Sequence, residues 1–315
     1  MIKLLICSPC FNEEECLIET ISRLKSILTE LKAKRLIESE SKILFVDDGS
    51  VDKTWEIIKN AAKKDEDILG IKFSKNFGHQ YALLAGIEFA ALNNFDIITI
   101  DSDLQQDETK IIEFVKKRIN GAEIIYGVRI DRKTDTFFKR KTAQLFYSFM
   151  QKLGVKIIEN HADYRLLSSK AANTLANFKE TNLFLRGLIP LIGFKSDVVY
   201  FEVKERFAGK TKYSLKKMLD LALDGIASLS FVPLRLIFFV GFVSFIFSLS
   251  LIFYALYIVL FTDKAVPGWA STIIPIYLLG GIQLLSLGII GEYLSRIYLE
   301  TKRRPRYIIE EQIIK

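Results

Sequence analysis

Two aspartates separated by one residue, Asp101 and Asp103, follow an apolar run in "FDIITIDSDLQQDE" (95–108). Residues 97–101 are expected to form a buried strand, so both carboxylates would stand at its carboxyl end. Side chains alternate along an extended segment, and the two acids would therefore point to the same side. Carboxylate oxygens bind hard cations, and a cation would turn their repulsion into coordination. The spacing predicts a Mg²⁺ or Mn²⁺ site, with a helix cap as the alternative role for one aspartate.

A second acidic pair, Asp47 and Asp48, ends another apolar run in "VDDGSVDKT" (46–54). The small polar residues after it are typical of a turn that leads into a helix. A turn does not explain two successive acids. One of them could accept a hydrogen bond from a base N–H or a ribose hydroxyl.

Five apolar runs, separated by segments of helical length, indicate βαβ units around a mainly parallel sheet. In such sheets the ligand crevice lies at the carboxyl ends of the strands, so the polar residues that end the runs should converge there. The expected strands are 3–9, 42–50, 69–76, 95–103 and 123–129, and the expected helices are 13–35, 53–64, 80–93 and 108–120.

Two long runs, 236–262 and 265–291, contain no charged residue. Each exceeds the roughly 20 residues that cross a bilayer core, so two transmembrane helices are predicted, against the alternative of two buried helices in a large soluble core. Pro267 and Pro275 leave the start of the second helix open. Lys and Arg gather outside the pair, which predicts both ends in the cytoplasm. Residues 1–10 do not read as a signal peptide.

Three further segments point to a membrane surface. Segment 214–235 has an apolar face and adjoins the first predicted span, so it is expected to lie at the interface. Segment 137–154 has a similar pattern, with a core helix as the alternative. The basic run 302–306 is typical of a topology and anionic-lipid determinant rather than a nucleic-acid patch.

The chain has 315 residues, a formal charge of +7 and three cysteines. Cys7 and Cys10 form a C-x-x-C pattern, but a zinc site needs further ligands, and His79 and His161 do not have ligand spacing. Cys7 is therefore expected in a strand and Cys10 in the loop that follows it.

An ordered set of segments resembles the family-2 glycosyltransferases with the GT-A fold. With the two predicted spans it resembles the polyprenyl-phosphate glycosyltransferases, such as bactoprenol glucosyltransferases and dolichol-phosphate mannose synthases. Phe11 stands where the family commonly has Tyr, and Asp107-Glu108 replaces the usual Asp-Pro. The segments are "SPCFNEE" (8–14), "VDDGSVDKT" (46–54), "SKNFGHQYALLAG" (74–86), "DSDLQQDE" (101–108), "ADYRLLSSKA" (162–171) and "RFAGKTKYSLKKML" (206–219).

The resemblance implies a role for each matching residue. The catalytic set would be Asp163, Arg165, Asp103 and Gln105, with Asp163 either a base or a group that orients the sugar. The metal would lie on Asp101 and Asp103. The nucleotide would be surrounded by Pro9, Phe11, Glu13, Asp47 and Asp48. The lipid phosphate would meet Arg206, Lys210 and Ser214.

The resemblance also implies the reaction and its setting. A sugar, glucose as first choice, would pass with inversion from UDP-glucose to polyprenyl phosphate at the cytoplasmic face of the membrane, with Mg²⁺ or Mn²⁺. A homo-oligomer, such as a tetramer, is expected, and a nucleic-acid partner is not. The expected divisions are a GT-A domain (1–213), an amphipathic helix (214–235), a transmembrane hairpin (236–298) and a basic tail (299–315).

Four alternatives remain open or are disfavoured by the sequence. GDP-mannose could be the donor, as in a dolichol-phosphate mannose synthase. A non-catalytic membrane scaffold or lipid translocation partner would keep the spans without needing the acids. A processive polysaccharide synthase would resemble chains with a Q-x-x-R-W motif, which this sequence lacks. A nicotinamide oxidoreductase is disfavoured because no G-x-G-x-x-G follows the first run.

Overall fold

The structure is a computed structural model that describes residues 1–130, 161–180, 183–204 and 268–314, together with residues 239–244 and a few single or paired positions between 237 and 261. It divides into two compact units. The first contains residues 1–151, 156–218 and 304–315, and the second contains residues 152–155 and 219–303. Both segments expected at the membrane interface, 137–154 and 214–235, lie outside the described residues.

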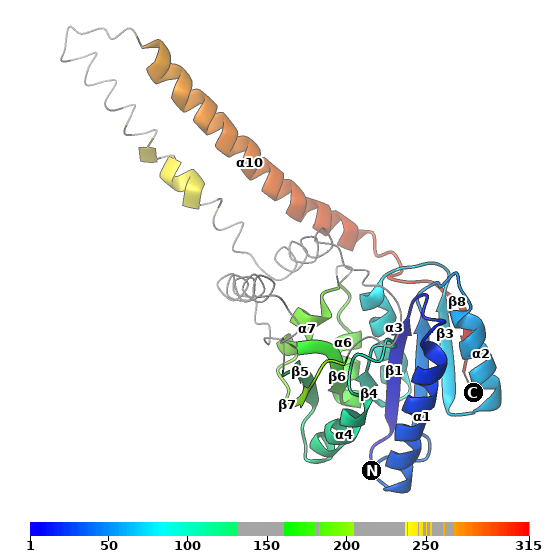
Figure 1. Cartoon of the computed structure of the whole chain (residues 1–315). Coiled ribbons are helices and arrows are strands. Elements are labelled where there is room, and N and C mark those ends of the chain that lie inside the picture. The colour runs from blue at the N-terminus through cyan, green and yellow to red at the C-terminus, as the bar shows by residue number, and fades with distance from the viewer. Residues whose placement is uncertain are drawn as a thin grey trace. The chain divides into compact units, whose positions relative to one another are not determined.

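The first unit is built on a mixed sheet of eight described strands in the order β7-β5-β6-β4-β1-β2-β3-β8 (Figure 1). Neighbours β4, β1, β2 and β3 are parallel, whereas β6 is antiparallel to β4 and β5, and β8 is antiparallel to β3. The predicted mainly parallel α/β fold is confirmed. The strands are β1 (Leu4–Cys10), β2 (Lys42–Asp47), β3 (Ile68–Phe73), β4 (Asp96–Thr99), β5 (Ile124–Arg129), β6 (His161–Leu167), β7 (Ser196–Phe201) and β8 (Ile309–Ile313).

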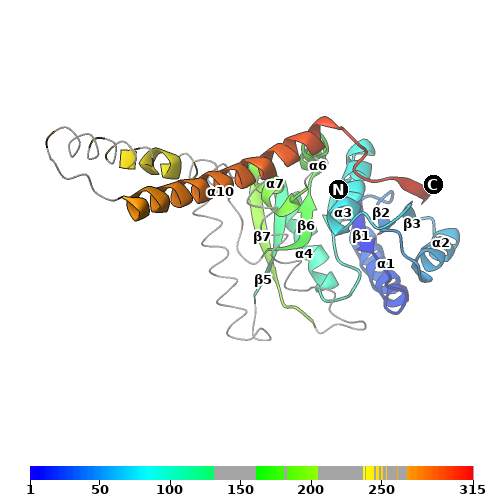
Figure 2. The same ribbon diagram turned by 90° about the horizontal axis from the view of Figure 1, so that it is seen from above.

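Helices cover both faces of this sheet. α1, α2 and α4 pack on one face, and α3 and α6 pack on the other (Figure 2). On α1 the buried side chains of Leu17, Leu24, Leu28 and Leu31 recur at helical spacing and form one apolar stripe. The helices are α1 (Leu17–Ala33), α2 (Thr54–Lys64), α3 (His79–Leu92), the short 3₁₀ helix η1 (Glu108–Lys110), α4 (Ile111–Ile119), α6 (Ser169–Ala176) and α7 (Leu185–Leu191).

The first strand, β1, runs through the middle of the core, and its cysteines belong to it. Cys7 is buried below α3, where a Cβ on Gly86 would come within 2.2 Å of Cys7 Sγ. Cys10 is the last residue of β1 and is also buried, so its predicted place in the following loop is wrong. The strand continues because Cys10 pairs with Asp47 of β2.

The C-terminal segment, residues 304–314, belongs to the first unit. The sequence analysis expected a basic tail here and did not predict β8, which pairs with the outer edge of β3. Trp55 Nε1 donates a 2.8 Å hydrogen bond to Glu311 Oε2 of β8. Arg306, expected to act within the basic run 302–306 as a topology and anionic-lipid determinant, is paired with Glu88 of α3. The end of the chain is thus a structural part of the sheet.

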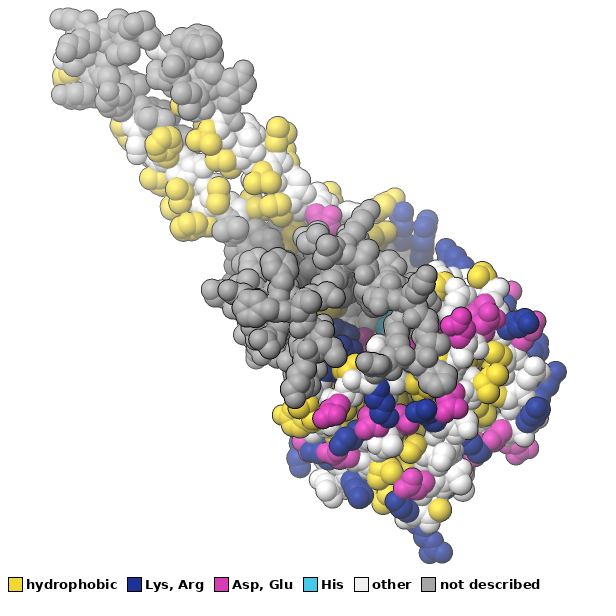
Figure 3. Space-filling view, in the orientation of Figure 1, with side chains coloured by type: hydrophobic (Ala, Val, Ile, Leu, Met, Phe, Trp, Pro, Cys, Tyr) yellow, Lys and Arg dark blue, Asp and Glu magenta, His cyan; other side chains and the backbone are white. Residues whose placement is uncertain are grey.

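The second unit contains α10 (Trp269–Thr301). Its segment Leu278–Thr301 has a mean hydropathy of 1.4 and is the one described helix long and apolar enough to cross a membrane. Hydrophobic and uncharged side chains dominate α10, whereas charged side chains of both signs are spread over the first unit (Figure 3). The helix continues through Pro275, so this proline does not mark its start. Most of the first predicted span, 236–262, lies outside the described residues, so the two-helix arrangement stays a prediction.

Candidate active site

The loops that follow β1 and β2 are bound to each other at the carboxyl edge of the sheet. The amide of Asn12, a residue with φ 53°, donates to Ser50 Oγ at 2.9 Å. Val51 N donates to Asn12 Oδ1 at 3.0 Å, and Glu13 N donates to Thr54 Oγ1 at 2.9 Å. The small polar residues of the "VDDGSVDKT" segment therefore fix the β1 loop as well as starting α2.

Asp48 connects this pair of loops to residues 74–78, which we call loop 74–78. Its carboxylate accepts from Phe77 N at 2.7 Å and from Gly78 N at 2.9 Å. Burial raises the pKa of Asp48, and the two amide bonds oppose that rise. Gly49 has φ +70°, and a Cβ there would lie 2.3 Å from the carbonyl carbon of Lys75. Only glycine allows the β2 loop to approach loop 74–78 this closely.

Asp47 has a different environment from its neighbour. Its Oδ1 accepts from the amide of Ser50 at 3.1 Å and from the Ser50 hydroxyl. Its Oδ2 is buried and has no hydrogen-bond partner, and burial raises the pKa of this carboxyl. Of the two acids, Asp47 is the one with a carboxylate oxygen still available to an incoming donor.

The remaining residues expected at the nucleotide lie at the end of β1. Pro9 is buried, and its carbonyl accepts from Ser102 Oγ at 3.1 Å. Glu13 Oε2 accepts from Cys16 Sγ at 3.3 Å. Phe11, two residues before Glu13, is partly exposed. The nucleotide side therefore adjoins the segment that carries Asp101 and Asp103.

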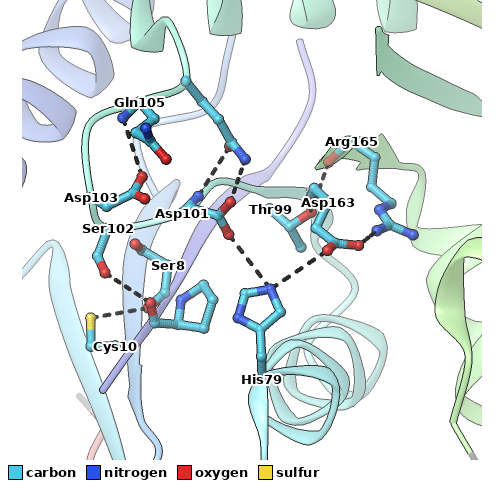
Figure 4. A network of polar contacts seen from close by, with 12 residues as sticks. Ser8, Cys10, His79, Thr99, Asp101, Ser102, Asp103, Gln105, Asp163 and Arg165 are labelled. Atoms are coloured by element: carbon cyan, nitrogen blue, oxygen red, sulfur yellow. Dashed lines mark hydrogen bonds and ion pairs between the residues drawn. The ribbon is translucent and has the colours of Figure 1, made fainter. Parts of the chain in front are cut away.

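The "DSDLQQ" segment does not stay extended. It turns directly after Asp101, and Leu104 has φ 58°, so the expectation that one extended segment points Asp101 and Asp103 to the same side is wrong. Two hydrogen bonds join Gln106 to Asp101. Gln106 Nε2 donates to Asp101 Oδ2 at 2.6 Å, and Asp101 N donates to Gln106 Oε1 at 3.1 Å. Asp103 Oδ1 accepts from Gln105 N at 3.2 Å (Figure 4). The structure brings these residues together in one turn instead of on one strand face.

Asp163 lies on β6 next to this turn. Because β6 is antiparallel to β4 and Arg165 pairs with Thr99, Asp163 comes beyond the end of β4 on the side of Asp101. Its carboxylate accepts from Arg165 Nη2 and, at 2.8 Å, from Arg186 Nη2 of α7. Burial alone would raise the pKa of Asp163, but the charges of Arg186 and Arg165 hold it well below its usual range.

His79, the first residue of α3, joins the two acidic groups. Its Nε2 lies 3.5 Å from Asp101 Oδ1 and 3.7 Å from Asp163 Oδ2 (Figure 4). Burial lowers the pKa of this imidazole, but the neighbouring carboxylates of Asp163 and Asp101 outweigh burial and raise the pKa. The described cluster thus contains two carboxylates, two guanidiniums and one imidazole.

The sequence analysis gave no site role to His79, Gln106 or Arg186. His79 could have been found, because it follows Gly78 inside a segment already singled out and comes directly before the expected helix 80–93. Gln106 sits beside the chosen Gln105, and only the turn shows which glutamine binds Asp101. Arg186 carries no local signal, since its place at Asp163 depends on the packing of α7.

A divalent cation fits this donor set in part. Asp101 Oδ1 is buried and has no hydrogen-bond partner, but it lies 3.5 Å from His79 Nε2, so a cation bound to this oxygen would compete with the imidazole. Among the described residues no group of three or more His, Cys, Asp and Glu side chains is arranged to hold a metal. Mg²⁺ commonly binds through one or two carboxylates plus substrate phosphates and water. Asp101 and Asp103 could serve in that way, and the substrate would have to complete the shell.

The residues expected at the lipid phosphate cannot be placed in this cluster. Arg206, Lys210 and Ser214 all lie outside the described residues, which stop at 204 in this part of the chain.

The fold and the polar edge define an α/β protein of the GT-A type, with a mostly parallel sheet and acidic loops at its carboxyl edge. The chain belongs to the Glycosyl transferase family 2, whose profile matches residues 5–175. It is therefore a glycosyltransferase, as the sequence analysis predicted.

Three relatives align over nearly the whole chain. The "Uncharacterized glycosyltransferase YkoT" of Bacillus subtilis (strain 168) is 50% identical over 98% of this chain and 91% of its own. The "Prophage bactoprenol glucosyl transferase homolog" of Escherichia coli (strain K12) is 39% identical over 98% of both chains. The "Bactoprenol glucosyl transferase" of Shigella phage SfV is 38% identical over 98% of this chain and 99% of its own.

Proposed function

We propose that this enzyme transfers a hexose, with glucose as first choice, from a UDP-sugar to polyprenyl phosphate at the cytoplasmic face of a membrane. The observation that carries the proposal is the match to relatives named bactoprenol glucosyl transferase, which extends over 98% of the chain and so includes the apolar C-terminal part. A scaffold without catalysis is set aside, because the chain belongs to a transferase family and keeps both acidic segments.

The donor would bind across the carboxyl edge of the sheet. Asp47 Oδ2, buried and without a partner, is available for an N–H or hydroxyl of the nucleotide. Asp48 would act on the donor indirectly, because its carboxylate is already engaged by the amides of Phe77 and Gly78. Pro9, Phe11 and Glu13 would complete this side of the site.

The diphosphate would lie over the turn that carries Asp101 and Asp103. A Mg²⁺ or Mn²⁺ held by these carboxylates would neutralise negative charge on the leaving nucleoside diphosphate. Gln106 fixes the orientation of Asp101 through two hydrogen bonds, which leaves Oδ1 facing His79, and the cation would replace that contact.

The acceptor would react without a strong base. A phosphate monoester has a second pKa near 6, so polyprenyl phosphate is mostly dianionic at neutral pH. One of its oxygens would attack the anomeric carbon while the bond to the diphosphate breaks on the opposite side, which inverts the configuration. A carboxylate with a strongly lowered pKa is a poor proton acceptor, so Asp163 fits a reaction that needs none. It would orient Arg165, Arg186 and His79 instead.

The C-terminal half of the chain would attach the enzyme to the membrane. The helix Leu278–Thr301 would span the bilayer together with residues 236–262 as a hairpin, with the catalytic domain and the C-terminus in the cytoplasm. Arg206, Lys210 and Ser214 would meet the lipid phosphate, segments 137–154 and 214–235 would lie at the interface, and the enzyme would be a homo-oligomer.

One donor panel tests the reaction. Purified full-length enzyme in lipid nanodiscs is given undecaprenyl phosphate, Mg²⁺ and one radiolabelled donor at a time: UDP-glucose, UDP-galactose, UDP-N-acetylglucosamine or GDP-mannose. We expect label in the lipid fraction from UDP-glucose and its loss with EDTA. Lipid labelled only from GDP-mannose would favour the mannose-synthase alternative. Absence of labelled lipid with every donor would refute the proposal.

A further inference from the structure

The C-terminal segment contacts loop 74–78 and the end of β3 from outside the candidate active site. Ser74 N donates to Ile308 O at 3.0 Å. The ring of Tyr307 stacks on Phe73, the last residue of β3, with centroids 4.8 Å apart. Phe73 in turn contacts Phe77 edge to face at 5.7 Å. The last residues of the chain therefore support the same loop whose amides hold Asp48.

The same segment is bound to α3 through one carboxylate. Glu88 accepts from Arg306 Nη2 and from the Tyr307 hydroxyl. Arg306 Nη1 also donates to Phe178 O at 2.9 Å. The side chains of Arg306 and Glu88 are only 12% and 22% exposed, so solvent screens the pair weakly. Loss of either partner leaves the other charge poorly solvated.

Loop 74–78 and α3, the two elements that the C-terminal segment contacts, both reach the candidate active site. Loop 74–78 donates to Asp48 on the nucleotide side, and α3 begins at His79, which faces Asp101 and Asp163. A shift of the loop or of the start of α3 would change both groups together. The C-terminal segment thus binds loop 74–78 through the amide of Ser74 and α3 through the carboxylate of Glu88.

We propose that the C-terminal segment is a positioning element of the donor site, in which Arg306 and Tyr307 act through Glu88 and Phe73 to fix loop 74–78 and the start of α3. The inference rests on the proposed function only in naming the ligand, a uridine nucleotide. Arg306, Tyr307 and Glu88 are positioning residues and do not touch the substrate.

The test uses full-length protein in nanodiscs. The variants are Arg306→Met and Glu88→Gln, which break the ion pair, and Tyr307→Phe, which removes one hydrogen bond and keeps the ring stack. The matched control is Glu311→Gln. It lies on β8 of the same segment, but it contacts Trp55 and Lys59 of α2 and not loop 74–78.

Amide hydrogen exchange is the first readout, because it needs no substrate. We expect the amides of Phe77 and Gly78 to exchange about tenfold faster in Arg306→Met and Glu88→Gln, since local opening controls exchange. Tyr307→Phe should have a smaller effect, and amides of β1 and β4 should be unchanged in all variants. Unchanged exchange at Phe77 and Gly78, or an equal increase in Glu311→Gln, would overturn the inference.

Substrate measurements form the second readout. The Kd of UDP and the KM of UDP-glucose should rise about tenfold in the ion-pair variants, while the KM of undecaprenyl phosphate stays within about twofold. The double variant Arg306→Met/Glu88→Gln should be no worse than either single variant, because both remove the same pair. Equal increases in both KM values, or additive effects, would contradict a role in positioning the donor.

The two proposals can fail separately. If the wild-type enzyme transfers no sugar from any donor, the proposed function fails while the exchange experiment still tests the C-terminal segment. If transfer occurs normally and amide exchange at loop 74–78 is the same in the three variants as in wild type, only the positioning role fails.

Discussion

Asp163 is a carboxylate that its neighbours keep ionised. Arg165 and Arg186 donate to it directly, and His79 lies within 3.7 Å. The resemblance offered two roles for this residue, a base and an orienting group. The surroundings favour the orienting role, because a base must accept a proton and the neighbouring positive charges oppose protonation of Asp163.

Asp163→Asn should therefore act first on stability. Arg165 is 1% exposed and would lose its main counter-charge, which costs about 3–5 kcal/mol when a buried pair is broken. Thermal unfolding of the full-length variant measures the loss. Lys117→Met, which removes a half-exposed pair with Asp197, is the control and should change stability by less than about 1 kcal/mol. Equal melting temperatures for Asp163→Asn and wild type would contradict this account.

The difference in stability between wild type and Asp163→Asn should depend on pH in a way that follows from the lowered pKa of Asp163. The pKa of Asp163 is lowered on folding, so its stabilising contribution is present above the unfolded value of about 4 and is lost as the pH falls through the folded value. We expect the gap between wild type and Asp163→Asn to shrink below about pH 4, as Asp163 is protonated. Because Asp163 also raises the pKa of His79, a further part of the gap should be lost as the pH rises through the folded pKa of His79. A gap that disappears entirely by about pH 8 would show that the ion pairs of Asp163 with Arg165 and Arg186 contribute nothing.

Asp101→Asn tests the proposed metal ligand. Replacing one carboxylate oxygen by an amide nitrogen removes a charge that the cation requires. We expect initial transfer rates to fall about 100-fold or more at saturating donor, with half-saturation shifted to higher Mn²⁺. Asp65→Asn, which alters a surface pair with Lys25, should leave the Mn²⁺ titration unchanged. A wild-type titration curve in Asp101→Asn would remove this residue from the metal site.

At the scale of elements, Gly49 sets how closely two loops approach. An alanine there would combine a positive φ with a 2.3 Å contact to the Lys75 backbone. Gly193 also has a positive φ, +73°, but its nearest atom to an added Cβ is 3.9 Å away. Gly193→Ala should lose about 1 kcal/mol for conformation alone, and Gly49→Ala should lose clearly more and weaken UDP binding. Chemical unfolding compares the two. Equal losses would show that the loops can separate without cost.

The sequence predicted the elements whose signals are local. The expected helix 53–64 and α2 (Thr54–Lys64) differ by one residue, because the turn chemistry before Thr54 and the apolar spacing after it lie within a few residues. The carboxyl-edge location of Asp47, Asp48 and Asp101 follows equally directly from strand ends.

The elements that depend on distant partners were not predicted. β8 is a short strand with two glutamates, and it forms because the edge of β3 and the side chains of Trp55 and Lys59 are available to it. The turn at Asp101 is stabilised by Gln106, five residues later, which an alternating pattern cannot show. Arg186 reaches Asp163 only through the packing of α7.

At the scale of the whole molecule, α10 provides the testable link to the membrane. Leu287 lies within the segment Leu278–Thr301 and is exposed in the structure. Leu287→Arg should make insertion less favourable by about 2.5–3.5 kcal/mol, the cost of an arginine near the middle of a spanning helix. Leu299→Arg, near the end of the same helix, should cost far less, because the side chain can reach the interface. Resistance to alkaline extraction from membranes measures both. Equal extraction of the two variants would count against a spanning helix.

The pairing of β8 with β3 also sets an order of events during synthesis. The ribosome completes β3 some 230 residues before β8, since β3 ends at Phe73 and β8 begins at Ile309. Until then one edge of the sheet has exposed peptide groups, which invite pairing with another chain. The sheet of the first unit is therefore complete only after residues 309–313 have been made, and a chain cut off ahead of Arg304 would leave the edge of β3 unpaired and prone to aggregation.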